Sequence, residues 1–539
     1  MDSASLPRAR LVLWAALVPL VYAPLYLVGR HPVGWWWLPL LSTAIAATAV
    51  ALLLRTDLLD RAAVRLAPHA GRILAAAIVL YVAGSTLVTR VRLQSFGDAS
   101  QVGLFSQSCW TLLRGHPFSN TGETVDGTLG SHLGVHFSPT LVLLAPLYAL
   151  YQNPITLVVA QALVVALATV PLYRLLQRDM GEAGATVCSL ALLAVPNLYW
   201  AGVHDFRDAN FLPALLITAY WALEHRRHVL LVIASIAALG VREEAGLVIV
   251  MMGVYALLRS HGWRMGFGLM ALGAVWTAIV IPMMSSLFWT PGLWIDPRGF
   301  FQDVLGQWGS TPLAAAQGMV ASPGAVGSAI VNGETARYLY RLASPLLVIP
   351  PLLDPVWIMG LPTIALNLLS RLGWMRNPGT YYSIVPATFL ALAATRVVVR
   401  SSWHVPLARR NAFSLALGLV VLAGALPSLP FAAPQLELPI PPRAPARAVV
   451  GMIPKDASVY APLALYPALC NRESFGCWDC LKENGRRWSM RGRYDWVVVW
   501  PDEYPPDTPR DRPLADSLRA DPRFEEVPGH EPFVVFRRR

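Results

Sequence analysis

The chain has 539 residues, of which 55% are hydrophobic and 14% are charged, and this composition excludes an ordinary soluble domain. Its formal net charge of +11 does not indicate a nucleic-acid partner, because the arginines fall mostly in short loops between apolar segments, where they determine topology. We therefore predict a helical protein that crosses a lipid bilayer many times.

Three apolar segments near residues 11–29, 35–54 and 72–90 open the chain, and each is long enough to cross roughly 30 Å of hydrocarbon as a helix. The first lacks a small-residue cleavage site and is followed at once by another span, so we expect it to be retained. With a cytoplasmic amino terminus, the polar loop 91–138 lies outside the membrane.

This loop is expected to begin with a helix along the membrane surface, because four apolar residues fall on one of its faces: Val102, Phe105, Cys109 and Leu112. Asp98 precedes that helix and either caps it or carries chemistry. His132 and His136 are four residues apart, a spacing that metal ligands on a helix can have, although Gly134 argues against a stiff helix.

The apolar stretch 139–151 is short for a span and contains Pro146. If it crossed the membrane, Arg174 and Arg178 would lie outside, against the preference of arginine for the cytoplasmic side. We therefore place this stretch in the outer interface.

The same reasoning makes residues 230–258 a hairpin of two short helices that meet at Arg242, Glu243 and Glu244. Ionisable groups deep in a membrane are costly and usually face a cavity or a partner. Alternatively, Arg242 neutralises one of the glutamates and only fixes the packing of the helices.

Further polar segments are predicted on the outer side, as in an active site that faces the periplasm or the cell exterior. They are the apex with His204, Asp205, Arg207 and Asp208, the long loop 289–337, and residues 371–382, which include Tyr381 and Tyr382. A last span near 411–429 delivers the rest of the chain outside.

The composition changes after residue 430. We divide the chain into amino-terminal transmembrane helices (1–72), a transmembrane core (73–430), a proline-rich linker (431–446) and an extracytoplasmic α/β domain (447–539). Apolar runs at 457–461, 496–500 and 533–536 are predicted strands of that domain.

The five cysteines divide into two groups. In the carboxyl-terminal domain, Cys470, Cys477 and Cys480 favour one disulfide over a redox or zinc site, whereas Cys109 and Cys188 are expected to be packed thiols. The sequence contains no Walker loop, GxSxG elbow or paired CxxC zinc site, which disfavours the enzyme classes that need them.

Several motifs together resemble an uncharacterised prokaryotic family of predicted polytopic membrane proteins. The motifs are Phe96-Gly97-Asp98, Gln107 to Trp110, Gly115 to Phe118, His132 to Pro139, Pro146 to Tyr148, Gln161, His204-Asp205-Phe206, Arg242-Glu243-Glu244, Tyr381-Tyr382-Ser383, Ile453 to Val459 and Tyr494 to Val498.

This family in turn resembles the GT-C class of glycosyltransferases, which take sugars from polyprenyl-phosphate donors. The resemblance implies that Asp98 is the general base and that Asp205 or Asp208 forms a second acidic site. It also implies that the phosphate is contacted by arginine, with Arg207, Arg242, Arg371 and Arg376 as candidates, or by a divalent ion such as Mg²⁺ or Mn²⁺. His132, His136 and Asp205 would hold that ion or position the acceptor.

We therefore expect an all-α, GT-C-like fold with about 11–13 transmembrane or re-entrant helices, in the cell (inner) membrane. Its expected partners are the lipid bilayer, a polyprenyl-phosphate-linked sugar and an extracytoplasmic acceptor glycan, lipid or protein. The expected catalytic residues are Asp98 and Asp205. The expected substrate-binding residues are Gln107, His132, His136, His204, Arg207, Asp208, Arg242, Glu243, Glu244, Tyr381 and Tyr382.

Two alternatives stay open. A transporter or lipid flippase would use the charges at Arg242 to Glu244 as a relay or substrate site. A non-catalytic assembly protein would keep the fold without the chemistry, and would capture its partner with the carboxyl-terminal domain.

Overall fold

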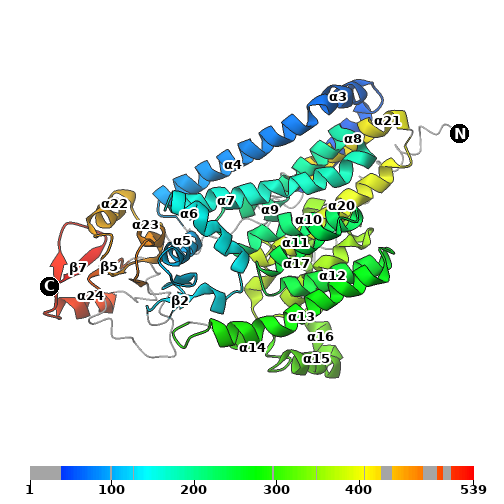
Figure 1. The fold of residues 1–539 in the computed structure, drawn as a ribbon. Coiled ribbons are helices and arrows are strands. Elements are labelled where there is room, and N and C mark those ends of the chain that lie inside the picture. Colours follow the sequence, from blue (N-terminus) through cyan, green and yellow to red (C-terminus); the bar gives the residue numbers. More distant parts are fainter. Residues whose placement is uncertain are drawn as a thin grey trace.

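Apolar helices form most of the molecule, and a small mixed sheet stands at one end of them (Figure 1). The computed structural model describes residues 38–97, 100–124, 127–293, 297–346, 349–405, 407–425, 440–476, 494–501 and 512–539. The predicted span 11–29 and residue Asp98 lie outside these ranges.

The helices of the first half are α2 (Leu38–Leu53), α3 (Leu58–Leu66), α4 (Ala70–Gln94), α5 (Ser100–Leu112), α6 (Ala145–Leu150), α7 (Pro154–Leu167), α8 (Thr169–Ala194), α9 (Pro196–Val203) and α10 (Leu212–Glu224). Those of the second half are α11 (His228–Leu239), α12 (Ala245–Leu258), α13 (Trp263–Leu287), α14 (Pro297–Leu305), α15 (Pro312–Ala321), α16 (Pro323–Ile330), α17 (Gly333–Ala343), α18 (Ile349–Leu352), α19 (Leu361–Leu369), α20 (Ile384–Ser402) and α21 (Leu407–Ala425).

Four helical stretches of the described residues are long and apolar enough to cross a membrane: Leu58–Gln94, Pro154–Ala194, Trp263–Leu287 and Tyr381–Ser401. Shorter apolar helices accompany them, among them His228–Leu239, Ala245–Leu258 and Pro139–Leu150. The prediction of a polytopic helical membrane protein is confirmed, while the direction in which each helix crosses stays a prediction.

The predicted hairpin is present, because α11 and α12 are two short helices that meet at residues 240–244. Helix α12 then packs closely on α13. A Cβ atom at Gly253 would lie 2.5 Å from the carbonyl oxygen of Gly266, and one at Gly273 would lie 2.4 Å from that of Gly246. Small residues at these positions let the two backbones approach, as is common between membrane helices.

The polar loop 91–138 is folded rather than extended. Helix α5 is followed by a short antiparallel pair, β1 (Ser119–Asn120) and β2 (Gly130–Ser131), and by the 3₁₀ turn η2 (His132–Gly134). Residues 102–109 of α5 are all buried, so both faces of this helix are covered, while its position along the membrane surface stays a prediction. The periodic apolar face was real, but the carboxyl-terminal domain covers the opposite face: a Cβ atom at Gly103 would lie 3.0 Å from the backbone of Pro467.

The predicted external loop 289–337 contains α14, α15 and α16 at the lower edge of the bundle (Figure 1). Residues 304–333 carry no charge, and apolar side chains there are exposed: Leu313 (70%), Val320 (82%) and Val331 (81%). Such exposure is typical of a surface that contacts lipid.

The carboxyl-terminal domain contains a five-stranded sheet in the order β4-β3-β5-β7-β6. Its strands are β3 (Val459–Tyr460), β4 (Phe475–Gly476), β5 (Trp496–Val499), β6 (Phe524–Val527) and β7 (Val534–Arg538), with α22 (Arg443–Met452), α23 (Tyr466–Leu469) and α24 (Arg512–Arg519). Strand β3 pairs in parallel with β4 and β5, whereas β7 pairs antiparallel with β5 and β6. The three strands predicted from apolar runs are confirmed.

The described cysteines, Cys109, Cys188 and Cys470, are buried free thiols. Cys477 and Cys480 lie outside the described residues, so a disulfide involving them stays a prediction. Cys109 and Cys188 were predicted to be packed thiols, and this prediction is confirmed.

Candidate functional site

A buried arginine at the tip of the α11–α12 hairpin organises the candidate site. Only 1% of Arg242 is exposed. Its Nη1 lies 3.3 Å from Asp208, its Nε donates to Glu244 at 2.9 Å, and its Nη2 lies 4.0 Å from Glu243. Three carboxylates thus surround one guanidinium. The sequence had indicated a pairing of Arg242 with one of the adjacent glutamates, but not the contact with Asp208.

Asp208 reaches this guanidinium from the segment between α9 and α10, in the 3₁₀ turn η4 (Asp208–Phe211). The single hydroxyl proton of Ser138 is shared between the Val241 carbonyl, at 2.9 Å, and Asp208 Oδ2, at 3.3 Å, which holds this carboxylate beside the hairpin. The contacts join three segments that are far apart in the sequence. They place Asp208, and not only the hairpin, at the centre of the ionic cluster.

His136 joins the same cluster from the loop, and its Nδ1 lies 2.8 Å from Glu243 Oε1. Burial and the charge of Arg242 lower the pKa of His136, but the carboxylates of Glu243 and Asp208 outweigh them and leave it above its usual value. The site therefore favours the imidazolium form of His136.

Aromatic rings form one wall of the cluster. The guanidinium of Arg242 lies 5.2 Å from the ring centre of Tyr381 and 5.8 Å from that of Tyr382, and Arg207 lies 5.0 Å from Tyr381. Arg242, Asp208 and Tyr382 are buried, whereas Arg207 and Tyr381 are half-buried. The floor of the cluster is therefore ionic and buried, and the two residues at its rim are partly exposed.

Arg207 differs from Arg242 in its charge balance. Within the described part of the chain, no carboxylate forms an ion pair with Arg207, and its backbone N–H donates to Gln161 Oε1 at 2.8 Å. At the rim, Arg207 thus has a fixed backbone and a guanidinium that none of the described carboxylates neutralises.

Asp205 has a different environment from Asp208. Its carboxylate accepts from the backbone N–H groups of Gln101 at 2.8 Å and Val102 at 2.9 Å, at the start of α5. A carboxylate in this position satisfies unpaired donors and the positive end of the helix dipole. Asp205 therefore anchors the helix that directly follows Asp98 in the sequence.

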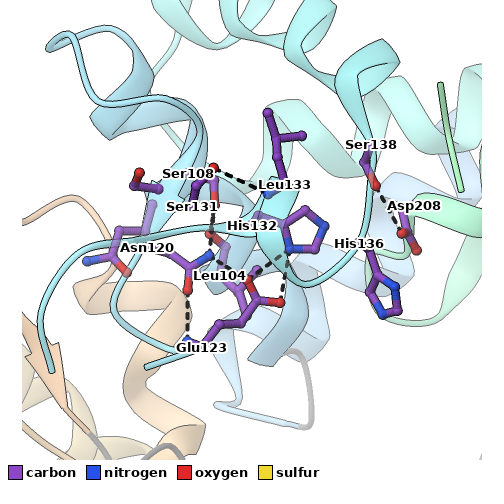
Figure 2. Close-up of polar contacts among 12 residues, drawn as sticks. Leu104, Ser108, Asn120, Glu123, Ser131, His132, Leu133, His136, Ser138 and Asp208 are labelled. Carbon is purple, nitrogen blue, oxygen red and sulfur yellow. Dashed lines mark hydrogen bonds and ion pairs between the residues drawn. The ribbon is translucent and has the colours of Figure 1, made fainter. Parts of the chain in front are cut away.

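A second histidine–carboxylate pair lies beside the ionic cluster (Figure 2). His132 Nδ1 is 2.9 Å from both oxygens of Glu123, and Asn120 holds this carboxylate with a 2.8 Å hydrogen bond from its amide. His132 and His136 have ring centres 6.0 Å apart and bind different carboxylates.

His204 ends α9 with a buried Nε2 that has no hydrogen-bond partner among the described residues. Burial, together with the nearby charges of Arg92 and Arg207, lowers the pKa of His204 to about 3. This imidazole is therefore neutral.

Gln107 is a joint between the loop and the carboxyl-terminal domain. Its Oε1 accepts from the Thr121 N–H at 3.0 Å and from the Tyr466 hydroxyl, and its Nε2 donates to the Arg472 carbonyl at 2.9 Å. The side chain is fully buried, and the hydrogen bonds of its amide connect the loop to the carboxyl-terminal domain.

We expect Gln107→Ala to lower the free energy of unfolding by at least about 2 kcal/mol, because each buried group left without a partner costs about 1–3 kcal/mol. Limited proteolysis of purified protein should then cleave the carboxyl-terminal domain faster. Gln101→Ala on the same helix is the matched control, since only the backbone of Gln101 contributes a described hydrogen bond. Equal cleavage of both variants would contradict this role.

The remaining phosphate-binding candidates lie in other ion pairs. Arg371 contacts Asp303 at 3.2 Å, and Arg376 contacts Glu334 at 3.5 Å. Arg207 is therefore the better candidate among the arginines.

Among the residues that the structure describes, no three His, Cys, Asp or Glu side chains are arranged to hold a metal ion. Asp205 caps a helix and Asp208 pairs with Arg242. A divalent ion shared by Asp205, His132 and His136 stays a prediction.

Sequence reasoning missed Glu123, Asn120 and Ser138 as members of the site. Glu123 and His132 are nine residues apart in irregular backbone, where no periodicity links them. Ser138 meets Asp208 across 70 positions. A local sequence signal could not have found these contacts.

The chain is similar to a family model and to solved structures. No curated protein matches the sequence. The crystal structure of ArnT from Cupriavidus metallidurans bound to undecaprenyl phosphate has a TM-score of 0.43 and 14% identity, and covers 85% of this chain and 97% of that chain. The apo structure of the same protein has a TM-score of 0.40 with the same identity and coverage. A family model described as "Predicted membrane protein (DUF2079)" matches residues 92–525. This chain therefore belongs to the DUF2079 family of membrane proteins, as its motifs predicted.

Proposed function

We propose that this protein is an integral membrane glycosyltransferase that transfers a sugar from a polyprenyl-phosphate donor to an extracytoplasmic acceptor. The observation that carries the proposal is the ionic cluster around Arg242, with its closed floor and half-buried rim. Ionisable groups at the tip of a membrane hairpin are costly, and they are retained where a polar substrate is handled. The resemblance of the family to the GT-C class supplies the reaction type.

Arg207 is the proposed contact of the donor phosphate. It carries the unpaired guanidinium of the rim, whereas the charge of Arg242 is already compensated by Asp208 and Glu244. Guanidinium groups bind phosphate oxygens with strong, charge-assisted hydrogen bonds. In the transfer, the same contact would stabilise the charge that grows on the leaving phosphate.

The transferred sugar is proposed to lie against Tyr381 and Glu244. The ring of Tyr381 is half-buried and offers an apolar face, and the Glu244 side chain, 20% exposed, offers carboxylate oxygens to hydroxyl groups. Arg242 then acts as a positioning residue, since it fixes the carboxylates rather than contacting the substrate.

Asp98 is proposed as the general base that takes the proton of the acceptor hydroxyl. In this step, the acceptor oxygen bonds to the sugar carbon, and the bond from that carbon to the phosphate oxygen breaks. The leaving lipid phosphate keeps the electron pair.

We expect Arg207→Gln to weaken binding of undecaprenyl phosphate by roughly 10- to 100-fold, because a hydrogen bond to a charged group contributes about 1.5–3 kcal/mol. Titration of the lipid into protein in nanodiscs measures this. Arg207→Lys keeps the charge and should lose less.

Arg114→Gln is the matched control, because the Arg114 guanidinium also lies over an aromatic ring, 3.6 Å from the centre of Trp110, but outside the cluster. It should bind undecaprenyl phosphate like the wild type. If Arg207→Gln also binds like the wild type, the phosphate is held elsewhere and the assignment of Arg207 is wrong.

A further inference from the structure

His132 has an arrangement that the ionic cluster does not explain. Only 1% of the residue is exposed, and its Nδ1 lies 2.9 Å from both oxygens of Glu123. A carboxylate accepts hydrogen bonds, so this contact places a proton on Nδ1. In the neutral ring, Nε2 is then an acceptor.

Among the residues that the structure describes, that acceptor has no partner. His132 Nε2 is buried and makes no hydrogen bond with any described residue. A buried polar atom without a partner is destabilising and requires an explanation. The nearest rings, Phe105 at 4.7 Å and Phe118 at 5.8 Å between ring centres, provide no hydrogen-bonding atom.

The carboxylate that orients the ring is itself held in place. Asn120 accepts from the Glu123 N–H at 2.9 Å and donates to its carboxylate at 2.8 Å. Such second contacts fix the tautomer and direction of a functional imidazole. In Figure 2 the ring of His132 lies between Glu123 and the side of the cluster formed by His136 and Asp208.

We infer that His132 is a substrate-positioning residue whose Nε2 accepts a hydrogen bond from a substrate hydroxyl group, with Glu123 fixing the ring for this contact. The inference rests on the proposed function, in which both the donor sugar and the acceptor carry hydroxyl groups. It adds Glu123 and His132 to the part of the loop 91–138 that recognises the substrate.

Two substitutions distinguish the role of His132 Nδ1 from that of His132 Nε2. The amide of His132→Asn lies near the position of Nδ1 and can still donate to Glu123, but leaves nothing at the position of Nε2. The longer His132→Gln places its amide near Nε2 and loses the contact with Glu123. A purely structural histidine would be replaced better by asparagine, and a substrate-binding one by glutamine.

The experiment compares three quantities in wild type and both variants. They are the affinity for undecaprenyl phosphate, the affinity for undecaprenyl-phosphate hexoses, and the amount of cell-envelope extract, as the source of acceptor, that gives half-maximal release of undecaprenyl phosphate. His132→Asn should bind the lipid phosphate unchanged. A roughly tenfold loss in hexose-donor affinity would assign the hydroxyl to the donor sugar. A tenfold increase in the half-maximal amount of extract alone would assign it to the acceptor.

His132→Gln should stay within about threefold of wild type in the affected quantity, with a lower thermal midpoint because Glu123 loses its contact with the imidazole. If His132→Asn equals wild type in all three quantities, or if only His132→Gln is impaired, the inference is wrong. Failure of the wild type to bind or release any lipid phosphate would instead overturn the proposed function, and this inference with it.

Discussion

Replacing Arg242 by alanine should lower the free energy of unfolding by about 3–5 kcal/mol, the usual cost of removing one partner from a buried ionic group. The substitution leaves Asp208, Glu243 and Glu244 around a site with no guanidinium. Denaturant titration of the purified protein in bicelles measures the loss. The double variant Arg242→Ala/Asp208→Ala should recover part of it, because it removes one of the uncompensated charges.

Arg371→Ala is the control for the loss of an arginine. Arg371 pairs with Asp303 at the surface, where the side chains are 58% and 55% exposed, and such pairs contribute less than about 1 kcal/mol. Equal, small losses in the Arg242 and Arg371 variants would contradict the organising role of Arg242.

The second large effect is expected from Asp98→Asn, which should reduce turnover by about 10²- to 10⁴-fold, the range that a general base contributes. The amide keeps the size of the side chain but cannot take the acceptor proton. Release of undecaprenyl phosphate from a labelled lipid-linked sugar measures turnover, and a binding titration checks that the donor still binds.

Asp303→Asn removes an exposed carboxylate from a surface ion pair and should keep full turnover. If Asp98→Asn also keeps full turnover, another group is the base.

Much of the fold could be predicted from the sequence because a bilayer imposes simple rules. The α11–α12 hairpin followed from the preference of arginine for the cytoplasmic side, because residues 230–258 are too few for two full spans. The carboxyl-terminal strands followed from short apolar runs after the proline-rich segment. Both signals are local, and both depend on composition rather than on distant contacts.

The burial of α5 on both faces could not be predicted in this way. Its apolar face indicated a surface helix, and nothing nearby in the sequence shows that Tyr466 packs on its other side. Gln107 and Tyr466, which join the two parts, are 359 positions apart. A single sequence carries no signal for such a contact.

The candidate site shows the same division. The charges of Arg242, Glu243 and Glu244 were visible as an anomaly in an apolar segment, and the predicted pairing of Arg242 with a glutamate is confirmed. The contact with Asp208 spans 34 positions and the pair His136–Glu243 spans 107 positions. The structure alone provides these partners, and they distinguish the ionic role of Asp208 from the helix-capping role of Asp205.

The measurement that tests the central claim most directly is the release of undecaprenyl phosphate from a panel of undecaprenyl-phosphate sugars by purified wild-type protein in nanodiscs, with cell-envelope extract as the source of acceptor. We expect release with at least one sugar, and strong reduction in the Asp98→Asn variant. The thermal midpoint of the protein shows whether it is folded. If folded protein neither binds nor releases any lipid of the panel, a glycosyltransferase function is contradicted.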